Sequence, residues 1–302
     1  MKPQLPAAVS EPPTLHGLAA GEAGRPHSAD WTIPQDWAAY TPAEHATWAT
    51  LFERQCRLLP GRACDAFLKG LDALPIAPDR IPDFEALSEV LMKATGWQVV
   101  AVPGLVPDEV FFDHLAHRRF PSGQFIRRAD QLDYLQEPDV FHDVFGHVPM
   151  LMNPVMADYM QAYGVGGLRA QRLGMLAELA RVYWYTVEFG LVMQPEGLRL
   201  YGAGIASSYS ESRFCLDDPS PHRVRFVLER VMRTRYRIDD FQECYFVLQD
   251  LDELLALARV DFGPVYAQVA GAQTFEPGAL QPGDTVLHRG TGAYHRDRRP
   301  PH

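Results

Sequence analysis

Residues 137–150 read EPDVFHDVFGHVPM, a mostly apolar stretch that carries two histidines, His142 and His147, five positions apart. Residues four apart share one face of a regular α-helix, whereas a step of five carries the second side chain well round the axis. Two imidazoles spaced in this way converge on one point only where the helix is interrupted. The local fold therefore decides whether the pair is a metal site or two ordinary, partly buried histidines.

Signals for a helix end surround the second histidine. Pro138-Asp139, near the start of the stretch, is typical of a helix start, and Gly146 and Pro149 flank His147. Glycine is common where a helix exits, and a nearby proline cannot continue one. We expect His142 on a short helix and His147 just beyond its end, where the broken helix turns the second ring back toward the first.

A third candidate ligand lies in residues 175–193, MLAELARVYWYTVEFGLVM, which are predicted as one long helix. Between residues 182 and 193 the only formally charged residue is Glu188, which shares a helix face with Trp184 and Leu191. Burial of this carboxylate without a partner would raise its pKa by as much as roughly 3–5 units. Glu188 therefore needs a cation, which is either an arginine side chain or a metal.

Two imidazoles and one carboxylate make a facial triad, which leaves one side of a metal ion open. This donor set suits non-haem Fe(II) enzymes that activate O₂, but zinc hydrolases use the same donors, so the triad alone does not choose between them. A hydrolase also needs a general base, for which Asp143 and Glu137 are the nearby candidates. A rival pair, His114 and His117, is followed by two arginines whose charge disfavours a cation, and we interpret it as ordinary helix-surface histidines.

The composition is that of a soluble globular protein. The chain has 302 residues, of which 47% are hydrophobic and 22% are charged. The net charge of −10, from 28 basic and 38 acidic residues, argues against a nucleic-acid or anionic-membrane surface. No stretch approaches the roughly 20 apolar residues of a membrane span, and the four cysteines form no CxxC pair. We expect a cytoplasmic protein.

The predicted fold class is mainly α with a few short strands (α+β). Residues 1–30 predict a disordered leader, residues 31–270 a single folded domain, and the Gly/Pro-rich residues 271–302 a C-terminal tail. Capping signals predict helices that begin at Thr41, Asp83, Asn153 and Ser220, the last carrying Val224, Val227, Leu228 and Val231. Short strands are expected at 97–102, 198–202 and 245–248, without the regular alternation of a doubly wound sheet.

Four segments resemble the aromatic amino acid hydroxylase family, and in particular its short bacterial members. They are QFIRR (124–128), EPDVFHDVFGHVP (137–149), YWYTVEFGL (183–191) and YGAGIASSYSE (201–211). The resemblance covers nearly all of residues 31–269. It implies that family's catalytic domain and the hydroxylation of L-phenylalanine to L-tyrosine, a step of phenylalanine catabolism, with O₂ and a tetrahydropterin co-substrate at an Fe(II) centre. Tyrosine or tryptophan hydroxylation within the same family is the alternative.

The resemblance also implies roles for single residues. His142, His147 and Glu188 match the iron ligands. Arg127 matches the arginine that holds the substrate carboxylate, for which a guanidinium fork is suited, and Asp139 matches the acid that orients it. Further residues expected at the substrate pocket are Ser207, Trp184, Phe189 and Tyr134, the last in a loop that flanks the active site.

A second set of matches concerns the pterin. Phe111 matches the phenylalanine that stacks on the pterin ring, although the residues alone predict an ordinary core position. The backbone from Gly104 through Val106 to Asp108 matches the segment that forms hydrogen bonds to the pterin. Glu211 matches a residue on the pterin side of the pocket.

Two positions depart from the family pattern. Leu135 stands where some members carry a threonine that contacts the amino acid, and Pro121 stands where relatives often have a histidine near the pterin. The chain has no room for the regulatory domain of animal relatives, and no heptad helix for tetramer formation follows the domain. We therefore expect an unregulated monomer.

Overall fold

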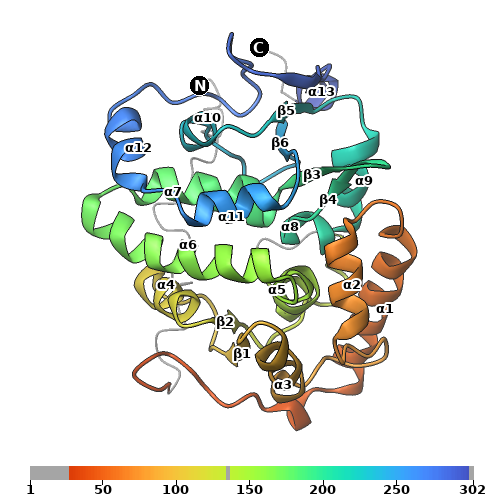
Figure 1. Ribbon diagram of the computed structural model, residues 1–302. Helices are drawn as coiled ribbons and strands as arrows, with labels where there is room; N and C mark the ends of the chain where they lie inside the picture. The colour runs from red at the N-terminus through yellow and green to blue at the C-terminus, as the bar shows by residue number, and fades with distance from the viewer. Residues whose placement is uncertain (1–26, 134–136, 299–302) are drawn as a thin grey trace, which may run out of the picture.

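The computed structural model describes residues 27–133 and 137–298 and consists mainly of helices packed beside a small mixed sheet (Figure 1). The helices are α1 (Pro42–Leu58), α2 (Asp65–Ala73), α3 (Phe84–Ala94), α4 (Asp108–Ala116), α5 (Val148–Leu151), α6 (Pro154–Leu173), α7 (Leu176–Tyr183), α8 (Ala203–Ala206), α9 (Tyr209–Asp217), α10 (Leu228–Met232), α11 (Asp252–Ala258), α12 (Phe262–Val269) and α13 (Ala293–Arg298), with a short 3₁₀ helix, η1 (Trp37–Ala39). Two further segments, η2 (Phe141–His147) and η3 (Trp184–Glu188), are π-helical.

The strands form two separate sheets. In the larger sheet the strand order is β4-β3-β6-β5-β7, made from β3 (Leu191–Gln194), β4 (Gly197–Leu200), β5 (His222–Arg225), β6 (Cys244–Leu248) and β7 (Val286–His288). The central strands β3, β6 and β5 run parallel, and the two edge strands are antiparallel to their neighbours. A second, parallel pair joins β1 (Gln98–Ala101) to β2 (Arg119–Ser122). The predicted class, mainly α with short strands, is confirmed.

Side-chain caps begin the helices where the sequence predicts them. The Thr41 side chain accepts a hydrogen bond from the backbone N–H of Glu44, whose carboxylate accepts from the Thr41 N–H, and this capping box begins α1. The carboxylate of Asp83 caps α3 and the amide oxygen of Asn153 caps α6. At the far end of α6, Gly174 adopts a φ of 68°, which only glycine enters without strain.

Close packing of α4 against α6 places the predicted pterin segment. Gly167 of α6 lies so near Phe112 of α4 that an added Cβ would sit 2.1 Å from the ring. Gly164, one turn earlier, approaches the backbone of Ala116, where a Cβ would lie 2.4 Å from the nitrogen. The absence of side chains at these two glycines lets α4 and α6 approach closely, which fixes the position of the helix that carries Phe111.

Three local predictions are wrong. The helix predicted from Ser220 is instead the strand β5 followed by the short helix α10, because β5 fills a central position in the parallel sheet. The helix predicted over 175–193 ends at Glu188, and its last residues form β3. The chain also does not leave the helix before His147: η2 contains both histidines and continues directly into α5.

The segments at the two ends of the chain bear on the predicted domain limits. Most of the predicted leader, residues 1–26, lies outside the described residues, and residues 27–30 contact the domain, where the Asp30 carboxylate pairs with Arg119. The segment predicted as a tail contributes β7 to the edge of the larger sheet and places α13 beside it up to Arg298 (Figure 1). Residues 271–298 therefore pack as part of the same structural unit.

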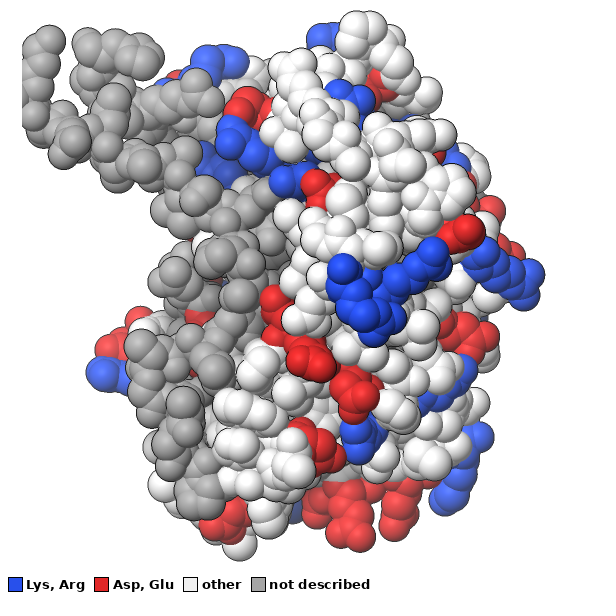
Figure 2. Space-filling view, turned by 90° about the vertical axis from the view of Figure 1, so that its left-hand side faces the viewer, with Lys and Arg blue, Asp and Glu red and all other residues white. Residues whose placement is uncertain are grey.

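The surface carries charges of both signs. On the face in Figure 2, basic and acidic side chains lie in small separate groups among uncharged ones. Within the described residues, no helix has the length and apolar character needed to cross a bilayer.

Candidate active site

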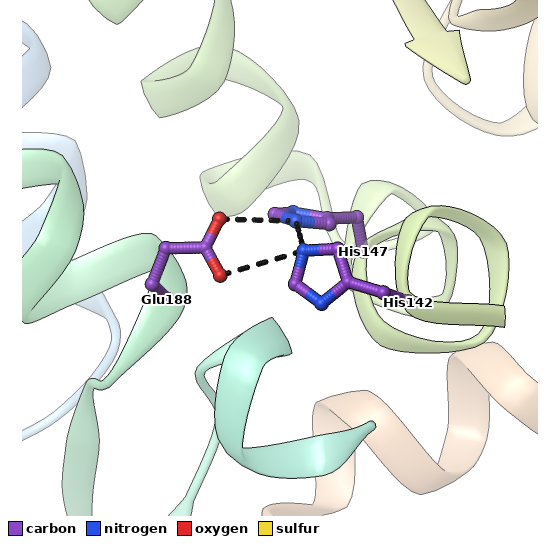
Figure 3. Close-up of side chains that lie close together, drawn as sticks. All are labelled: His142, His147 and Glu188. Atoms are coloured by element: carbon purple, nitrogen blue, oxygen red, sulfur yellow. Dashed lines mark hydrogen bonds and ion pairs between the residues drawn. The ribbon is translucent and has the colours of Figure 1, made fainter. Parts of the chain in front are cut away.

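Three side chains from two distant parts of the sequence meet at one point. His142 and His147 project from η2 and face the carboxylate of Glu188 at the end of η3 (Figure 3). The two Nε2 atoms are 3.2 Å apart, His147 Nε2 lies 3.2 Å from Glu188 Oε1, and His142 Nε2 lies 3.7 Å from Glu188 Oε2. Among the described residues, these three form the one group of potential metal ligands of this size, and their donor atoms lie within 4.8 Å of one another.

The π-helical geometry explains why histidines five residues apart converge. On an α-helix five residues correspond to about 500° of rotation, which leaves the two side chains about 140° apart. A π-helix forms hydrogen bonds from residue i to residue i+5, so residues with this spacing come onto the same face. The second ligand segment is also π-helical and brings Glu188 to its final position. The wider π-helical turn, rather than a helix break, therefore brings the imidazoles of His142 and His147 together.

Ser207 fixes the orientation of the first imidazole. Its hydroxyl donates a hydrogen bond to the carbonyl oxygen of Ala203 at 2.8 Å, and its oxygen lies 3.0 Å from His142 Nδ1. A serine hydroxyl has one proton, so His142 Nδ1 is the donor in the second bond. The lone pair of the neutral ring is therefore on Nε2, directed at the other two ligands, as metal sites require.

The donor set fits a divalent metal. A proton on His147 Nε2 could bind to either Glu188 or His142, but not to both, whereas a cation interacts favourably with all three donors. Donors about 2.1 Å from a metal are about 3.0 Å apart at adjacent octahedral positions and about 3.4 Å apart in a tetrahedron. The observed separations of 3.2–3.7 Å match both geometries. The site therefore accepts iron or zinc on geometric grounds.

Burial sets the charge of the groups beside this site. Burial lowers the pKa of His142 to about 4, against the attraction of Glu188, so the ring is neutral at pH 7 and free to bind a metal. Burial also raises the pKa of Asp143 to about 7, and the backbone N–H of Gly123 donates to its carboxylate at 2.9 Å. Sequence reasoning considered Asp143 only as a base for a hydrolase, although its position between the ligands indicated that it would be enclosed with them.

Arg127 and Asp139 form a buried bidentate ion pair. Nε and Nη2 of Arg127 each lie 2.9 Å from one oxygen of Asp139, and the two side chains are 7% and 0% exposed. Asp139 also accepts a hydrogen bond from the backbone N–H of His142 at the start of η2. The carboxylate that orients the guanidinium thus also holds the first turn of the metal-binding segment.

Trp184 and Phe189 lie side by side next to Glu188. Their ring centroids are 4.7 Å apart, and the Trp184 indole N–H donates to Gln242 Oε1 at 2.9 Å. The Trp184 ring also stacks on Tyr236, with ring centroids 4.3 Å apart. Sequence reasoning missed Gln242 and Tyr236, because nothing in their local pattern marks them as neighbours of the metal site.

Glu211 is buried and contacts Gln242, the partner of Trp184. Its carboxylate accepts hydrogen bonds from the Tyr245 hydroxyl and from the backbone N–H of Gln242, and burial raises its pKa to about 7. These contacts tie Glu211 to the residues that hold Trp184. Its predicted contact with a pterin stays a prediction.

The residues predicted for the pterin approach the metal site from the α4 side. Phe111 is buried and makes an edge contact with Tyr183 at 6.1 Å, and Tyr183 in turn lies 6.4 Å from the His147 ring. Val106 and Asp108 are buried at the start of α4, and Gly104 has a φ of 156°. Pro121 lies in β2.

Other candidate positions lie away from this arrangement or outside it. His114 is buried, not on the surface as predicted, and its Nε2 is 2.8 Å from the carbonyl oxygen of Asp30, whereas His117 is exposed and interacts with Asp113. Neither belongs to the metal-binding group. Tyr134 and Leu135 lie outside the described residues.

Comparison with known proteins identifies the family. Residues 29–260 match the model of the biopterin-dependent aromatic amino acid hydroxylases. The chain belongs to this family. Over 265 residues it is 63% identical to the phenylalanine-4-hydroxylase of Caulobacter vibrioides, an alignment that covers 88% of this chain and 90% of that protein.

Solved structures agree with this assignment. The phenylalanine hydroxylase of Chromobacterium violaceum with bound iron(III) and oxidised 7,8-dihydrobiopterin superimposes with a TM-score of 0.84 at 59% identity, covering 88% of this chain and 96% of that one. The iron- and phenylalanine-bound structure of the same enzyme gives a TM-score of 0.84 at 57% identity, covering 88% and 97%. The resemblance inferred from the four sequence segments is confirmed.

Proposed function

We propose that this protein is a phenylalanine 4-hydroxylase, which converts L-phenylalanine to L-tyrosine with O₂ and a tetrahydropterin at an Fe(II) centre. The observation that carries the proposal is the facial arrangement of His142, His147 and Glu188 in a chain of this family. High identity to phenylalanine-4-hydroxylases over most of the chain favours phenylalanine over tyrosine or tryptophan. It also disfavours the zinc hydrolase that the donor set alone allowed.

The three ligands would hold a metal ion from one side only. An Fe(II) ion bound by two imidazoles and one carboxylate would keep a net positive charge and would stay accessible to O₂. When bound, iron and the tetrahydropterin supply the reducing equivalents that activate O₂. Ser207 keeps the His142 lone pair directed at the metal, and Asp139 holds the backbone of the same turn.

Arg127 is suited to bind the carboxylate of the amino acid. Of the five N–H donors of its guanidinium group, two bind Asp139 and one binds the carbonyl oxygen of Leu132. Within residues 27–133 and 137–298 no hydrogen-bond partner occupies the other two donors, which can bind a ligand carboxylate, and the bidentate pair with Asp139 prevents the guanidinium group from rotating. Asp139 therefore acts as a positioning residue for Arg127.

Trp184 and Phe189 provide an aromatic surface for the substrate ring. Phe189 directly follows the ligand Glu188, so an aromatic ring seated against this pair lies next to the metal. Stacked aromatic rings gain about 0.5–1.5 kcal/mol beyond the burial of apolar area. We extend the proposal to the pterin, for which Phe111 offers a ring that contacts Tyr183, the neighbour of the His147 ring.

We further propose that the protein works in the cytoplasm as a monomer, with residues 31–270 as the catalytic core. Its four cysteines are all unpaired, which is usual in a reducing compartment. The sedimentation coefficient at micromolar protein concentration tests whether the protein is a monomer.

Product identification tests the activity. The protein is loaded with Fe(II) under anaerobic conditions and then given tetrahydropterin, O₂ and an equimolar mixture of phenylalanine, tyrosine and tryptophan. We expect tyrosine formed from phenylalanine as the main product. A fully iron-loaded sample that oxidises the pterin without hydroxylating any of the three amino acids would refute the proposal.

A ligand variant with a matched control tests the metal assignment. His142→Ala is expected to lose both iron and activity. His117→Ala removes an exposed histidine outside the site and is expected to retain both. Equal iron contents in the two variants would overturn the ligand set.

A further inference from the structure

The C-terminal segment, residues 285–298, is fastened to the domain by backbone hydrogen bonds next to the β7 edge of the larger sheet. The N–H groups of Thr291 and Gly292 donate to the carbonyl oxygens of Pro219 and Ser220, each at 2.9 Å. The Ser220 hydroxyl accepts a further hydrogen bond from the N–H of Tyr294 at 3.0 Å. Together with β7 these bonds hold α13 in one position.

From this position the segment contacts the loop of residues 237–242, which joins α10 to β6. The Tyr294 hydroxyl donates to Asp240 Oδ1 at 3.0 Å, and its ring lies 5.2 Å from that of Phe241. Phe214 stacks on the other face of this cluster, 4.5 Å from Phe241 and 5.0 Å from Tyr294. The next residue, His295, is 5% exposed and directs its ring toward Asp240. The C-terminal segment thus holds this loop through the hydrogen bond from Tyr294 to Asp240 and through packed rings.

The same loop holds Trp184. Gln242 ends the loop, is 2% exposed, and accepts the indole N–H of Trp184 at 2.9 Å. Its amide nitrogen donates to the carbonyl oxygen of Arg237 at 2.9 Å, so the orientation of the side chain depends on the shape of the loop. Tyr236, just before the loop, stacks on the indole. Two contacts of Trp184 therefore come from this loop and from the residue that precedes it.

We propose that Tyr294 is a positioning residue: the C-terminal segment fixes the 237–242 loop and, through Gln242, the indole that lines the amino acid site. This inference rests on the proposed function, because it takes Trp184 as part of the substrate surface. A loop without regular secondary structure keeps one conformation only if its side chains are held. The contacts of Tyr294 with Asp240 and Phe241 hold this loop from outside the sheet. The domain predicted to end at residue 270 then needs the following segment for a fully formed pocket.

The experiment compares two tyrosine-to-phenylalanine variants of the full chain. Tyr294→Phe removes the hydroxyl that binds Asp240 and retains the ring. Tyr266→Phe removes the hydroxyl of a buried tyrosine that makes no hydrogen bond within the described residues, and it serves as the matched control. Ser220→Ala loosens the same segment in a second way, by removing the acceptor for the Tyr294 N–H.

Two readouts are measured on iron-loaded protein. The first is the ¹⁹F NMR spectrum after 5-fluorotryptophan labelling of the 5 tryptophans, with the Trp184 signal assigned from Trp184→Phe. The second is steady-state kinetics, from which KM for phenylalanine and kcat are determined separately. For Tyr294→Phe and Ser220→Ala we expect a shifted or broadened Trp184 signal. We also expect a KM raised about two- to tenfold, the factor that one neutral hydrogen bond contributes, with unchanged iron content.

The outcomes separate the inference from the proposed function. A Trp184 signal that stays at its wild-type position in both Tyr294→Phe and Ser220→Ala overturns the inference, whatever the activity. A signal that moves equally in Tyr266→Phe also overturns it, because the effect would then be a general loss of packing. If wild-type protein forms no tyrosine, the proposed function fails, and the NMR comparison still decides whether the segment positions the indole.

Discussion

Replacing Ser207 by alanine tests whether a single hydroxyl controls the metal site. The hydroxyl is buried, donates to Ala203 and accepts from His142 Nδ1. Without it the imidazole loses the bond that selects its tautomer and its ring orientation. Removal of such a partner of a metal-bound histidine typically lowers metal affinity 10- to 100-fold, which equals about 1.4–2.8 kcal/mol.

A nearby serine provides the control. Ser212 is fully buried, donates to the carbonyl oxygen of Ile205 at 2.7 Å and accepts from Gln55 Nε2 at 3.4 Å. Its bonding pattern matches that of Ser207, but its nitrogen partner is not a metal ligand. Both alanine variants are expected to lower the free energy of unfolding of the metal-free protein by about 1–3 kcal/mol, because each removes two buried hydrogen bonds that contribute about 0.5–1.5 kcal/mol apiece.

The assay is the affinity for Fe(II), measured anaerobically by competition with a chelator of known affinity. Ser207→Ala is expected to bind 10- to 100-fold more weakly than wild type, and Ser212→Ala to bind as wild type. Urea unfolding of each metal-free variant separates loss of affinity from loss of fold. If both variants bind iron with the same affinity, Ser207 does not orient His142, and the tautomer argument is refuted.

Three further predictions concern neighbouring groups. Glu211→Gln should remove a pH dependence of the free energy of unfolding. The pKa of Glu211 is raised from 4.5 to about 7 in the folded state, so the folded state binds the proton more tightly than the unfolded state. The free energy of unfolding therefore falls as the pH rises from about 4.5 to about 7. In urea unfolding, wild type should therefore lose about 3 kcal/mol relative to Glu211→Gln over this range, and parallel curves would contradict the assignment. Gly204→Ala should weaken iron binding, since an added Cβ would lie 3.0 Å from Glu188 Oε2, whereas Gly166→Ala, with nothing within 4 Å, should bind iron normally. Equal iron affinities of these two variants would rule out that contact as a constraint on Glu188. Arg127→Met should lower the free energy of unfolding by about 3–5 kcal/mol, because it leaves the fully buried Asp139 carboxylate unpaired, and a loss below about 1 kcal/mol in urea would show that Asp139 is not charged there.

Glu188 could be singled out from the sequence because a buried carboxylate carries a cost that a cation removes, whereas the two histidines were assigned as ligands by the family resemblance. Glu188 was recognisable as the one charged residue in an apolar stretch, and the structure places it against both predicted histidines. The helix starts at Thr41, Asp83 and Asn153 were equally predictable, since a capping side chain acts within its own turn.

The parts that could not be predicted depend on distant contacts. The segment from Ser220 has apolar residues at helical spacing, yet it pairs with β6, a partner that lies beyond the reach of any local pattern. Gln242 and Tyr236 contact Trp184 only after the chain has folded. The π-helical turns escaped prediction because their sequences satisfy α-helical patterns, and only packing decides between the two.

The two wide turns have a consequence for how this metal centre could be lost. A π-helical turn accommodates one residue more than an α-helical turn over the same stretch, and each residue on an α-helix adds about 100° of rotation. Inserting a single codon between His142 and His147 would leave every donor residue in the gene, yet at a spacing of six an α-helix turns the second imidazole about 120° away from the first. A deletion is a different case, because it leaves a spacing of four, which an α-helix brings onto one face. Chain length, as well as side-chain identity, is thus under constraint here.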